Sequence, residues 1–338
     1  MVARRRFVRL VQIGLEGVAG LLAVYLALFV TGAARAVASK SLVAASCATT
    51  MTVVAHEDDD LLFINPAVQD DIAAGRCLVT IFVTAGDDGQ GQAYWRERER
   101  GPMAAYAMMA GVADRWKRSR LRIGGRSLTR RELAGSRITL IYMRLPDGYS
   151  RGRARRESLQ ALWLGRVRSV HSLDAGTPYT RKALVKTLTG LMDRYEPGDI
   201  RTLDYVHSYG DGDHNDHHTV GYLTFLAQNN YHLPHQVTGY LGYPGDQRRA
   251  NLPRTVAARK LATFLAYAVH DRRVCRTDQA CMHNSYRPRF SRCRPVGSAT
   301  SFTPDPLAAD IPSMPAYISL PNPPRRKSRR RRNDNRPR

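Results

Sequence analysis

Three short runs of almost uninterrupted apolar residues constrain the fold of this chain more than any other feature. They are residues 51–55, 78–83 and 138–143. A strand with one face in water alternates between apolar and polar residues, whereas a strand covered on both faces is apolar throughout. The runs therefore predict three strands of a parallel sheet that is buried between two layers of helices.

Helical patterns separate and follow these strands, at residues 95–112, 180–195, 219–227 and 257–269. In the second of them, leucines fall on one stripe, Thr180 is the expected N-terminal cap and Pro197-Gly198 is the expected stop. Strands that alternate with helices indicate one α/β domain with three layers, helix, sheet and helix.

Much of the formal net charge of +23 lies at the two ends of the chain. Residues 325–338 carry a net +8 and the first nine residues carry +4, which leaves +11 for the remainder. The folded part therefore requires no specific nucleic-acid partner to explain its charge. We expect loops from Cys275 on and a solvated, disordered basic tail at residues 321–338, with contact to anionic polymers or lipids as the alternative.

A stretch of mostly apolar and small residues at 11–34 follows the N-terminal arginine cluster. A helix that crosses a bilayer needs about 20 residues, so this stretch is long enough to be a transmembrane helix or signal anchor. The basic residues before it favour a single pass through the cell membrane, with the domain extracytoplasmic. The alternative is a signal peptide cleaved near Ala34-Arg35-Ala36, which gives a secreted protein. The expected segments are the anchor (1–36), a linker (37–50), the domain (51–320) and the tail (321–338).

The five cysteines agree with export, because cysteines outside the cell usually form disulfides. Cys47 and Cys77 flank the first predicted strand, so a bond between them is one expectation. One pair among Cys275, Cys281 and Cys293 would leave a free thiol. A zinc knuckle built from these three is disfavoured, because the sequence contains no CxxC pair.

Two polar clusters stand where predicted strands end. Residues 56–60 read His-Glu-Asp-Asp-Asp and follow the first strand directly. Residues 213–218 read Asp-His-Asn-Asp-His-His and lie between the run 203–206 and the helix at 219–227. Ligands of open parallel sheets bind beyond the carboxyl ends of the strands. Two imidazoles and one carboxylate from these clusters would form a catalytic site for zinc, or for another divalent metal, with a position left for water.

The clusters resemble the motifs of one enzyme family. Residues 55–60 (AHEDDD) are similar to the AHPDDE motif of the GlcNAc-phosphatidylinositol de-N-acetylase (PIG-L/LmbE) family, and residues 214–217 (HNDH) are similar to its HPDH motif. Residues 84–87 (TAGD) resemble the end of the family's second strand, and residues 94–106 resemble the following helix of secreted members. The resemblance covers roughly residues 51–245.

The resemblance implies a Rossmann-like α/β fold and a zinc-dependent hydrolase. The substrate would be of the N-acetylglucosamine type, and the reaction would remove its N-acetyl group outside the membrane. His56, Asp59 and His217 of this chain match the positions that bind zinc in the family. His218 is the alternative to His217, and the motif spacing favours His217.

The resemblance also implies the roles of four other residues. Asp58 would be the general base on the attacking water. His214 would act on the oxyanion or the leaving amine, and Asp216 would orient it. Arg98 matches a family arginine near the substrate, with an ordinary helix-surface residue paired to a nearby glutamate as the alternative.

The chain departs from the family pattern at three positions: Glu57 and Asn215 replace prolines, and Asp60 replaces a glutamate. Proline supplies no ligand, so its loss should leave the metal set intact. An acidic run can also be a solvated loop, which is the alternative for Glu57 and Asp60.

Two other function classes compete with the hydrolase. The first is a basic protein that binds or processes nucleic acid or another anionic polymer, and export argues against it. The second is a non-catalytic glycan binder, and the retained Asp58 beside Asp59 argues against it. A calcium loop from Asp211 is excluded, because its sixth and twelfth positions lack the required glycine and glutamate.

Overall fold

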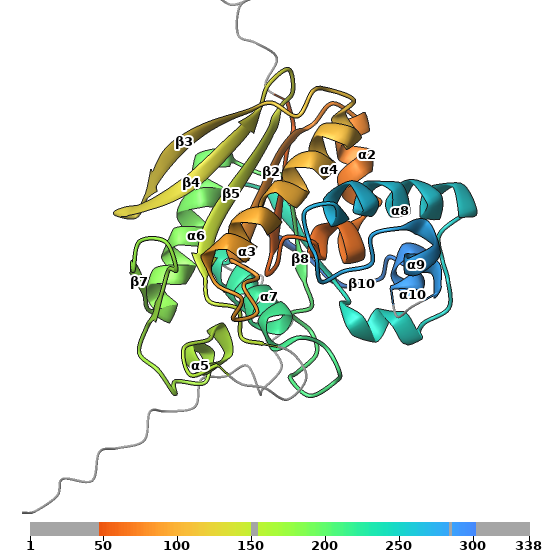
Figure 1. Cartoon of the computed structure of the whole chain (residues 1–338). Coiled ribbons are helices and arrows are strands. Elements are labelled where there is room, and N and C mark those ends of the chain that lie inside the picture. The colour runs from red at the N-terminus through yellow and green to blue at the C-terminus, as the bar shows by residue number, and fades with distance from the viewer. Residues whose placement is uncertain (1–46, 150–154, 284–285, 302–338) are drawn as a thin grey trace, which may run out of the picture. The chain divides into compact units, whose positions relative to one another are not determined.

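The computed structural model describes residues 47–149, 155–283 and 286–301 (Figure 1). The described residues from Ala48 on form one compact unit. The predicted membrane-spanning stretch at 11–34 and the basic tail at 321–338 lie outside the described residues. Within those ranges, no helix has the length and apolar character needed to cross a membrane.

An eight-stranded sheet has the order β10-β9-β8-β1-β2-β5-β4-β3. The strands from β9 to β5 pair in parallel, whereas β10 at one edge and β4 and β3 at the other pair antiparallel. The predicted strands are β1, β2 and β5, so the mostly parallel sheet is confirmed. The bounds are β1 (Thr49–Val54), β2 (Cys77–Thr84), β3 (Trp116–Ile123), β4 (Arg126–Leu133), β5 (Ile138–Leu145), β8 (Asp199–Leu203), β9 (His235–Tyr240) and β10 (Pro295–Ser301).

Helices pack in two groups on the sheet (Figure 1). One group contains α2 (Ala67–Ala73), α4 (Arg100–Ala110) and α8 (Arg254–Ala268), and the other contains α5 (Leu159–Trp163), α6 (Arg181–Tyr195) and α7 (Asn215–Gln228). The α/β architecture predicted from the apolar runs is therefore confirmed. The smaller elements are η1 (Asp60–Ile64), α3 (Gln92–Arg98), β6 (Val170–His171), β7 (Pro178–Tyr179), η2 (Tyr243–Gln247), α9 (Asp278–His283) and α10 (Arg287–Phe290).

The ends of α6 follow the predicted signals. Thr180 Oγ1 accepts a hydrogen bond from Ala183 N at 3.2 Å, which satisfies a backbone group that the first turn leaves unpaired. Glu196, at a left-handed φ of 48°, ends the helix just before Pro197. The cap and the stop expected from the sequence are both present.

The helix predicted at 95–112 differs from the structure, which contains the two helices α3 and α4. They meet at Glu99, whose carboxylate accepts hydrogen bonds from Arg144 Nε (2.5 Å) and Nη2 (2.9 Å). Arg144 belongs to β5, so this buried ion pair joins the helix junction to the sheet.

The prediction of loops from Cys275 on is wrong in part, because α9, α10 and β10 lie there. The strand β10 reads Pro-Val-Gly-Ser-Ala-Thr-Ser, so its pairing with β9 depends on backbone hydrogen bonds rather than on an apolar pattern. Cys275 and Cys281 form a disulfide and Cys293 is a free thiol, as the cysteine count predicted. Cys47 and Cys77 are also disulfide-bonded.

Gly101 in α4 lies against the ring of Tyr267, where an added Cβ would come within 2.2 Å of the ring atom Cδ2. Tyr267 is fully buried, so its ring cannot move without displacing its neighbours. We expect Gly101→Ala to lower the free energy of unfolding by about 1–3 kcal/mol, measured by urea denaturation. Gly198→Ala is the control, because a Cβ there meets no atom within 4 Å. Equal destabilisation by the two variants would contradict the clash.

Candidate functional site

The acidic run after β1 is buried, with residues 56–60 no more than 7 % exposed. The chain turns immediately, because His56 N donates a hydrogen bond to Asp59 Oδ2 at 2.6 Å and η1 begins at Asp60. The carboxylate of Asp59 is therefore held by the same turn that presents His56. The alternative of a solvated loop is wrong for Glu57 and Asp60, which are both fully buried.

The second polar cluster forms the N-terminus of α7. His214 is the cap residue, and its Nδ1 accepts a hydrogen bond from Asp216 N at 3.1 Å. His217 in the first turn is fully buried, and its Nδ1 lies 2.7 Å from Asp213 Oδ1. Because α7 follows β8 and β8 pairs with β1, the two clusters lie at neighbouring strand ends.

Asp59 lies between the two histidines that the motifs predict as ligands. Its Oδ1 is 3.1 Å from His217 Nε2 and 3.4 Å from His56 Nδ1. Two ligands of one tetrahedral zinc ion lie roughly 3.3 Å apart, because the bonds to nitrogen and oxygen are about 2.0–2.2 Å long. Each of these two distances, taken singly, matches the spacing of two ligands on one zinc ion.

His214 adds a third imidazole to this place. One nitrogen each of His56, His214 and His217 lies within 4.8 Å of the others. His214 and Asp59 thus compete geometrically for the third ligand position. Asp59 is favoured, because it contacts both other histidines and brings a negative charge, whereas one nitrogen of His214 already accepts the Asp216 N–H.

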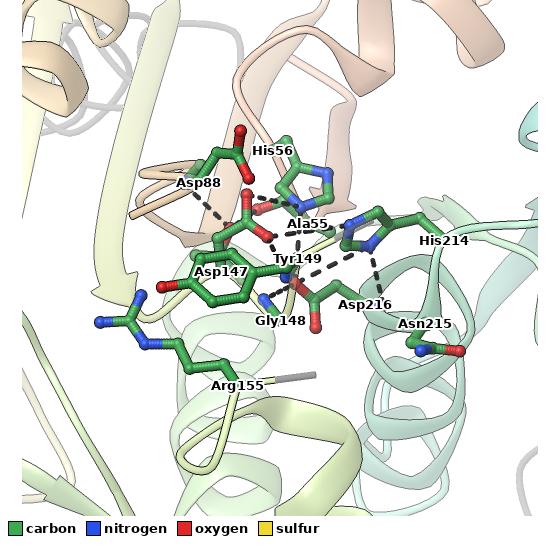
Figure 2. Close-up of polar contacts among 12 residues, drawn as sticks. Ala55, His56, Asp88, Asp147, Gly148, Tyr149, Arg155, His214, Asn215 and Asp216 are labelled. Atoms are coloured by element: carbon green, nitrogen blue, oxygen red, sulfur yellow. Dashed lines mark hydrogen bonds and ion pairs between the residues drawn. The ribbon is translucent and has the colours of Figure 1, made fainter. Parts of the chain in front are cut away.

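Asp147 is a member of the site that the sequence reading missed. Figure 2 shows its carboxylate facing two imidazoles, with Oδ2 3.7 Å from His56 Nε2 and Oδ1 3.7 Å from His214 Nε2. Asp147 follows β5, so it lies beyond the carboxyl end of the third apolar run. The sequence feature that could have identified Asp147 is the turn Pro146-Asp147-Gly148 after that run, which was interpreted only as the end of a strand.

Asp216 contacts the site through both its side chain and its main chain. Its Oδ2 accepts a hydrogen bond from Gly148 N at 2.7 Å and lies 3.5 Å from His56 Nε2, but 3.8 Å from His214 Nδ1 (Figure 2). The hydrogen bond to His214 comes from the backbone N–H of Asp216. Asp216 therefore orients His214 through its main chain.

Burial and neighbouring charges set the pKa values of the three histidines. Burial lowers the pKa of His217, but the charges of Asp59 and Asp213 outweigh it and raise this pKa to about 10. The pKa of His56 is raised well above its ordinary value in the same way, against burial, chiefly by Asp59. Burial and the nearby charge of His56 lower the pKa of His214 to about 4. The field at His56 and His217 therefore stabilises a positive charge.

A divalent cation fits this environment. Among the described residues, the buried His217 Nε2 has no hydrogen-bond partner. When His217 donates its Nδ1–H to Asp213, its Nε2 lone pair faces an Asp59 oxygen at 3.1 Å. Two facing acceptors need a proton or a metal ion between them, and a donor set of imidazoles and a carboxylate suits zinc.

Asp58 is paired with Arg98, whose Nη2 contacts Asp58 Oδ1. Arg98 is only 8 % exposed, and its Nη1 donates a hydrogen bond to Gly86 O at 2.8 Å. The alternative of a helix-surface arginine is therefore wrong. Arg98 instead joins the end of β2 to the acidic run after β1.

The two acidic residues that replace family residues in the first motif are both buried beside the site. Burial raises the pKa of Glu57 to about 8, and Arg98 Nε lies 3.5 Å from its Oε2. Burial raises the pKa of Asp60 to about 7, and its carboxylate accepts a hydrogen bond from Tyr106 OH. Asp60 thereby ties η1 to α4.

His218 faces a neighbouring loop. Its Nε2 lies 3.0 Å from Asp211 Oδ1 and its Nδ1 lies 3.2 Å from Asp204 O. His217 is the member of this pair that contacts Asp59.

Comparison with known proteins adds a family match. The family model described as PIG-L, GlcNAc-PI de-N-acetylase, matches residues 51–228. No curated protein matches the chain.

Solved structures give distant likenesses. A deacetylase of the teicoplanin biosynthesis pathway is 14% identical, with a TM-score of 0.40, covering 65% of this chain and 84% of that one. The N,N'-diacetylchitobiose deacetylase of Pyrococcus horikoshii is 12% identical, with a TM-score of 0.43 and coverage of 72% and 76%. The 4-carboxy-2-hydroxymuconate hydratase GalB of Pseudomonas putida is also 12% identical, with a TM-score of 0.36 and coverage of 65% and 78%.

Proposed function

The chain belongs to the PIG-L family of GlcNAc-PI de-N-acetylases, and from this premise we propose that it is a zinc-dependent hydrolase that removes an N-acetyl group from a substrate of the N-acetylglucosamine type. One observation carries the proposal. The buried Asp59 carboxylate contacts both His56 and His217, and Asp58 precedes it in the chain beside Arg98. His56, Asp59 and the carboxylate of Asp58 thus lie in one turn after β1, and His217 of α7 contacts this turn.

His56, Asp59 and His217 would hold the zinc. Bound there, zinc polarises an amide carbonyl and lowers the pKa of water to about 7. Asp213 supports this set, because its carboxylate holds the Nδ1 side of His217 and directs Nε2 toward Asp59.

Asp58 would move the proton of the hydrolysis, and His214 would stabilise the charge that develops on the carbonyl oxygen. Asp58 would accept a proton from the water that attacks the carbonyl carbon. His214 Nδ1 accepts the Asp216 N–H, so the neutral imidazole carries its proton on Nε2. That Nε2–H would stabilise the oxyanion, and the proton that Asp58 took from water would pass to the amine as the C–N bond breaks, which yields acetate and the free amino sugar.

The proposal is tested by acetate release from the full-length chain. The substrates are free GlcNAc, chitooligosaccharides, peptidoglycan fragments and GlcNAc-inositol conjugates. We expect release from at least one, loss of release with a chelator, and recovery on adding zinc. Absence of release from every substrate by zinc-loaded protein would contradict the deacetylase and leave the metal site standing.

Asp213→Ala is expected to weaken zinc binding roughly 10- to 100-fold, the usual effect of removing the outer partner of a metal-binding histidine. The measurement is competition with a chromogenic zinc chelator. Asp211→Ala is the matched control, because Asp211 contacts His218 and the backbone N–H of Asp213 but not His217 or the Asp213 carboxylate. Equal affinities for Asp213→Ala and wild type would contradict the assignment of His217 as ligand.

We also propose that residues 11–34 tether the domain to the outer side of the cell membrane and that the basic tail contacts anionic polymers or lipids. The apolar length of the stretch and the arginines before it support the tether. Protease treatment of intact cells tests it: a domain that is resistant until the cells are lysed contradicts the outer location.

A further inference from the structure

Two residues outside the matched range 51–228 contact Arg98, the arginine that is paired with Asp58. Tyr267 of α8 and Asp271 in the turn after it are both buried. Arg98 Nε donates a hydrogen bond to Tyr267 OH at 2.6 Å and lies 3.1 Å from Asp271 Oδ2. Tyr267 OH in turn donates to Asp271 Oδ2 at 2.7 Å. We call Arg98, Tyr267 and Asp271 the Arg98 clamp.

The other side of the guanidinium holds Asp58. Arg98 Nη2 contacts Asp58 Oδ1, while Nη1 donates to Gly86 O at 2.8 Å. A guanidinium is planar and rigid, so the partners of Nε also fix the directions of Nη1 and Nη2. Tyr267, Asp271 and Gly86 O thus hold the guanidinium that contacts Asp58.

The surrounding backbone leaves space for the clamp at two glycines. A Cβ at Gly86 would come within 2.3 Å of Arg98 Nη1, and one at Gly101 would come within 2.2 Å of the Tyr267 ring. Tyr94 OH donates to the second oxygen of Asp271 at 2.9 Å, so both carboxylate oxygens of Asp271 are bonded. The clamp is thus fixed sterically and by hydrogen bonds.

We propose that Tyr267 and Asp271 are positioning residues of the reaction, which act through Arg98 to hold Asp58 where it can take a proton from water. This inference rests on the proposed function, in which Asp58 is the base. It makes α8 part of the active site although α8 lies beyond the family match. Since neither residue is among the ligands or the proton-transfer groups, their loss should lower kcat and leave KM and zinc content unchanged.

The test compares kcat, KM and zinc content of Tyr267→Phe and Asp271→Asn with wild type, on the substrate that releases acetate. We expect kcat to fall about 10- to 100-fold, the effect of losing a hydrogen bond to a charged group. Tyr205→Phe is the matched control, because the buried Tyr205 hydroxyl has no hydrogen-bond partner among the described residues. Wild-type kcat in both clamp variants, or an equal loss in Tyr205→Phe, would overturn the inference.

A double-mutant cycle separates positioning from general stability. In an Arg98→Lys background, Asp271→Asn should lower kcat little further. A residue that acts through Arg98 loses its effect when the planar guanidinium is replaced by the ammonium of lysine. A structural role would give the same loss in both backgrounds, and that result overturns the inference.

The proposed function and the role of the Arg98 clamp can be tested separately. If wild type releases no acetate from any substrate, the proposed function fails. The same cycle is then measured in urea unfolding, where the clamp requires that the effects of Asp271→Asn and Arg98→Lys on the free energy of unfolding are coupled. Additive effects there would overturn the clamp itself.

Discussion

His217→Ala is expected to release the zinc and abolish acetate release. The substitution removes the fully buried imidazole that faces Asp59 Oδ1 at 3.1 Å and leaves the carboxylates Asp59 and Asp213 without their shared partner. The loss of zinc affinity should exceed the roughly 100-fold that removal of an outer partner produces. Metal analysis after dialysis, together with acetate release, measures both effects.

The neighbouring histidine provides the control for this prediction. His218 is equally buried on the same helix, but its two nitrogens contact Asp211 and Asp204. His218→Ala should therefore retain the zinc. If His218→Ala loses the ion and His217→Ala keeps it, the ligand is His218, and the motif alignment must be shifted by one residue.

Asp58→Asn is expected to lower kcat by about 10²- to 10⁴-fold, the usual contribution of a general base. Asparagine keeps the shape and can still accept a hydrogen bond from Arg98, but it cannot accept the proton from water. Zinc content should stay at the wild-type level, because Asp58 is not one of the proposed ligands. Near-wild-type kcat would remove Asp58 from the mechanism, and loss of zinc together with activity would place it among the ligands.

Glu57→Gln is the matched control for Asp58→Asn. Glu57 is the adjacent buried acid, and burial raises its pKa to about 8. Its carboxyl is therefore mostly neutral at pH 7, and glutamine is a close substitute for the neutral acid. We expect the kcat of Glu57→Gln to match wild type, so a loss equal to that of Asp58→Asn would mean that any change in this turn disrupts the site.

The parts of the fold that the sequence predicted are those that local pattern determines. The strands β1, β2 and β5 are covered on both faces, so their apolar runs are continuous and recognisable. The hairpin of β3 and β4 was missed for the opposite reason. Residues 116–133 include many arginines, because the hairpin lies at an edge of the sheet where much of its surface meets water.

The candidate site was predictable where its residues lie next to one another in sequence. His56 and Asp59 share one turn, and His214 and His217 share another, so two short motifs identified them. Asp147 contacts them only because β5 ends at the same edge of the sheet. Tyr267 and Asp271 were beyond prediction, because their approach to Arg98 spans some 170 residues and depends on how α8 packs against α4.

The antiparallel strands at both edges of the sheet bear on solubility. Every parallel strand that carries a site residue has a hydrogen-bonded neighbour on each side, so none of them offers an open backbone to another molecule. The outermost strand β3 carries exposed charges at Lys117, Arg118, Arg120 and Arg122, which repel an identical strand of a second copy. Neutralising these charges should promote association between copies at the β3 edge while leaving the chemistry at the strand ends untouched.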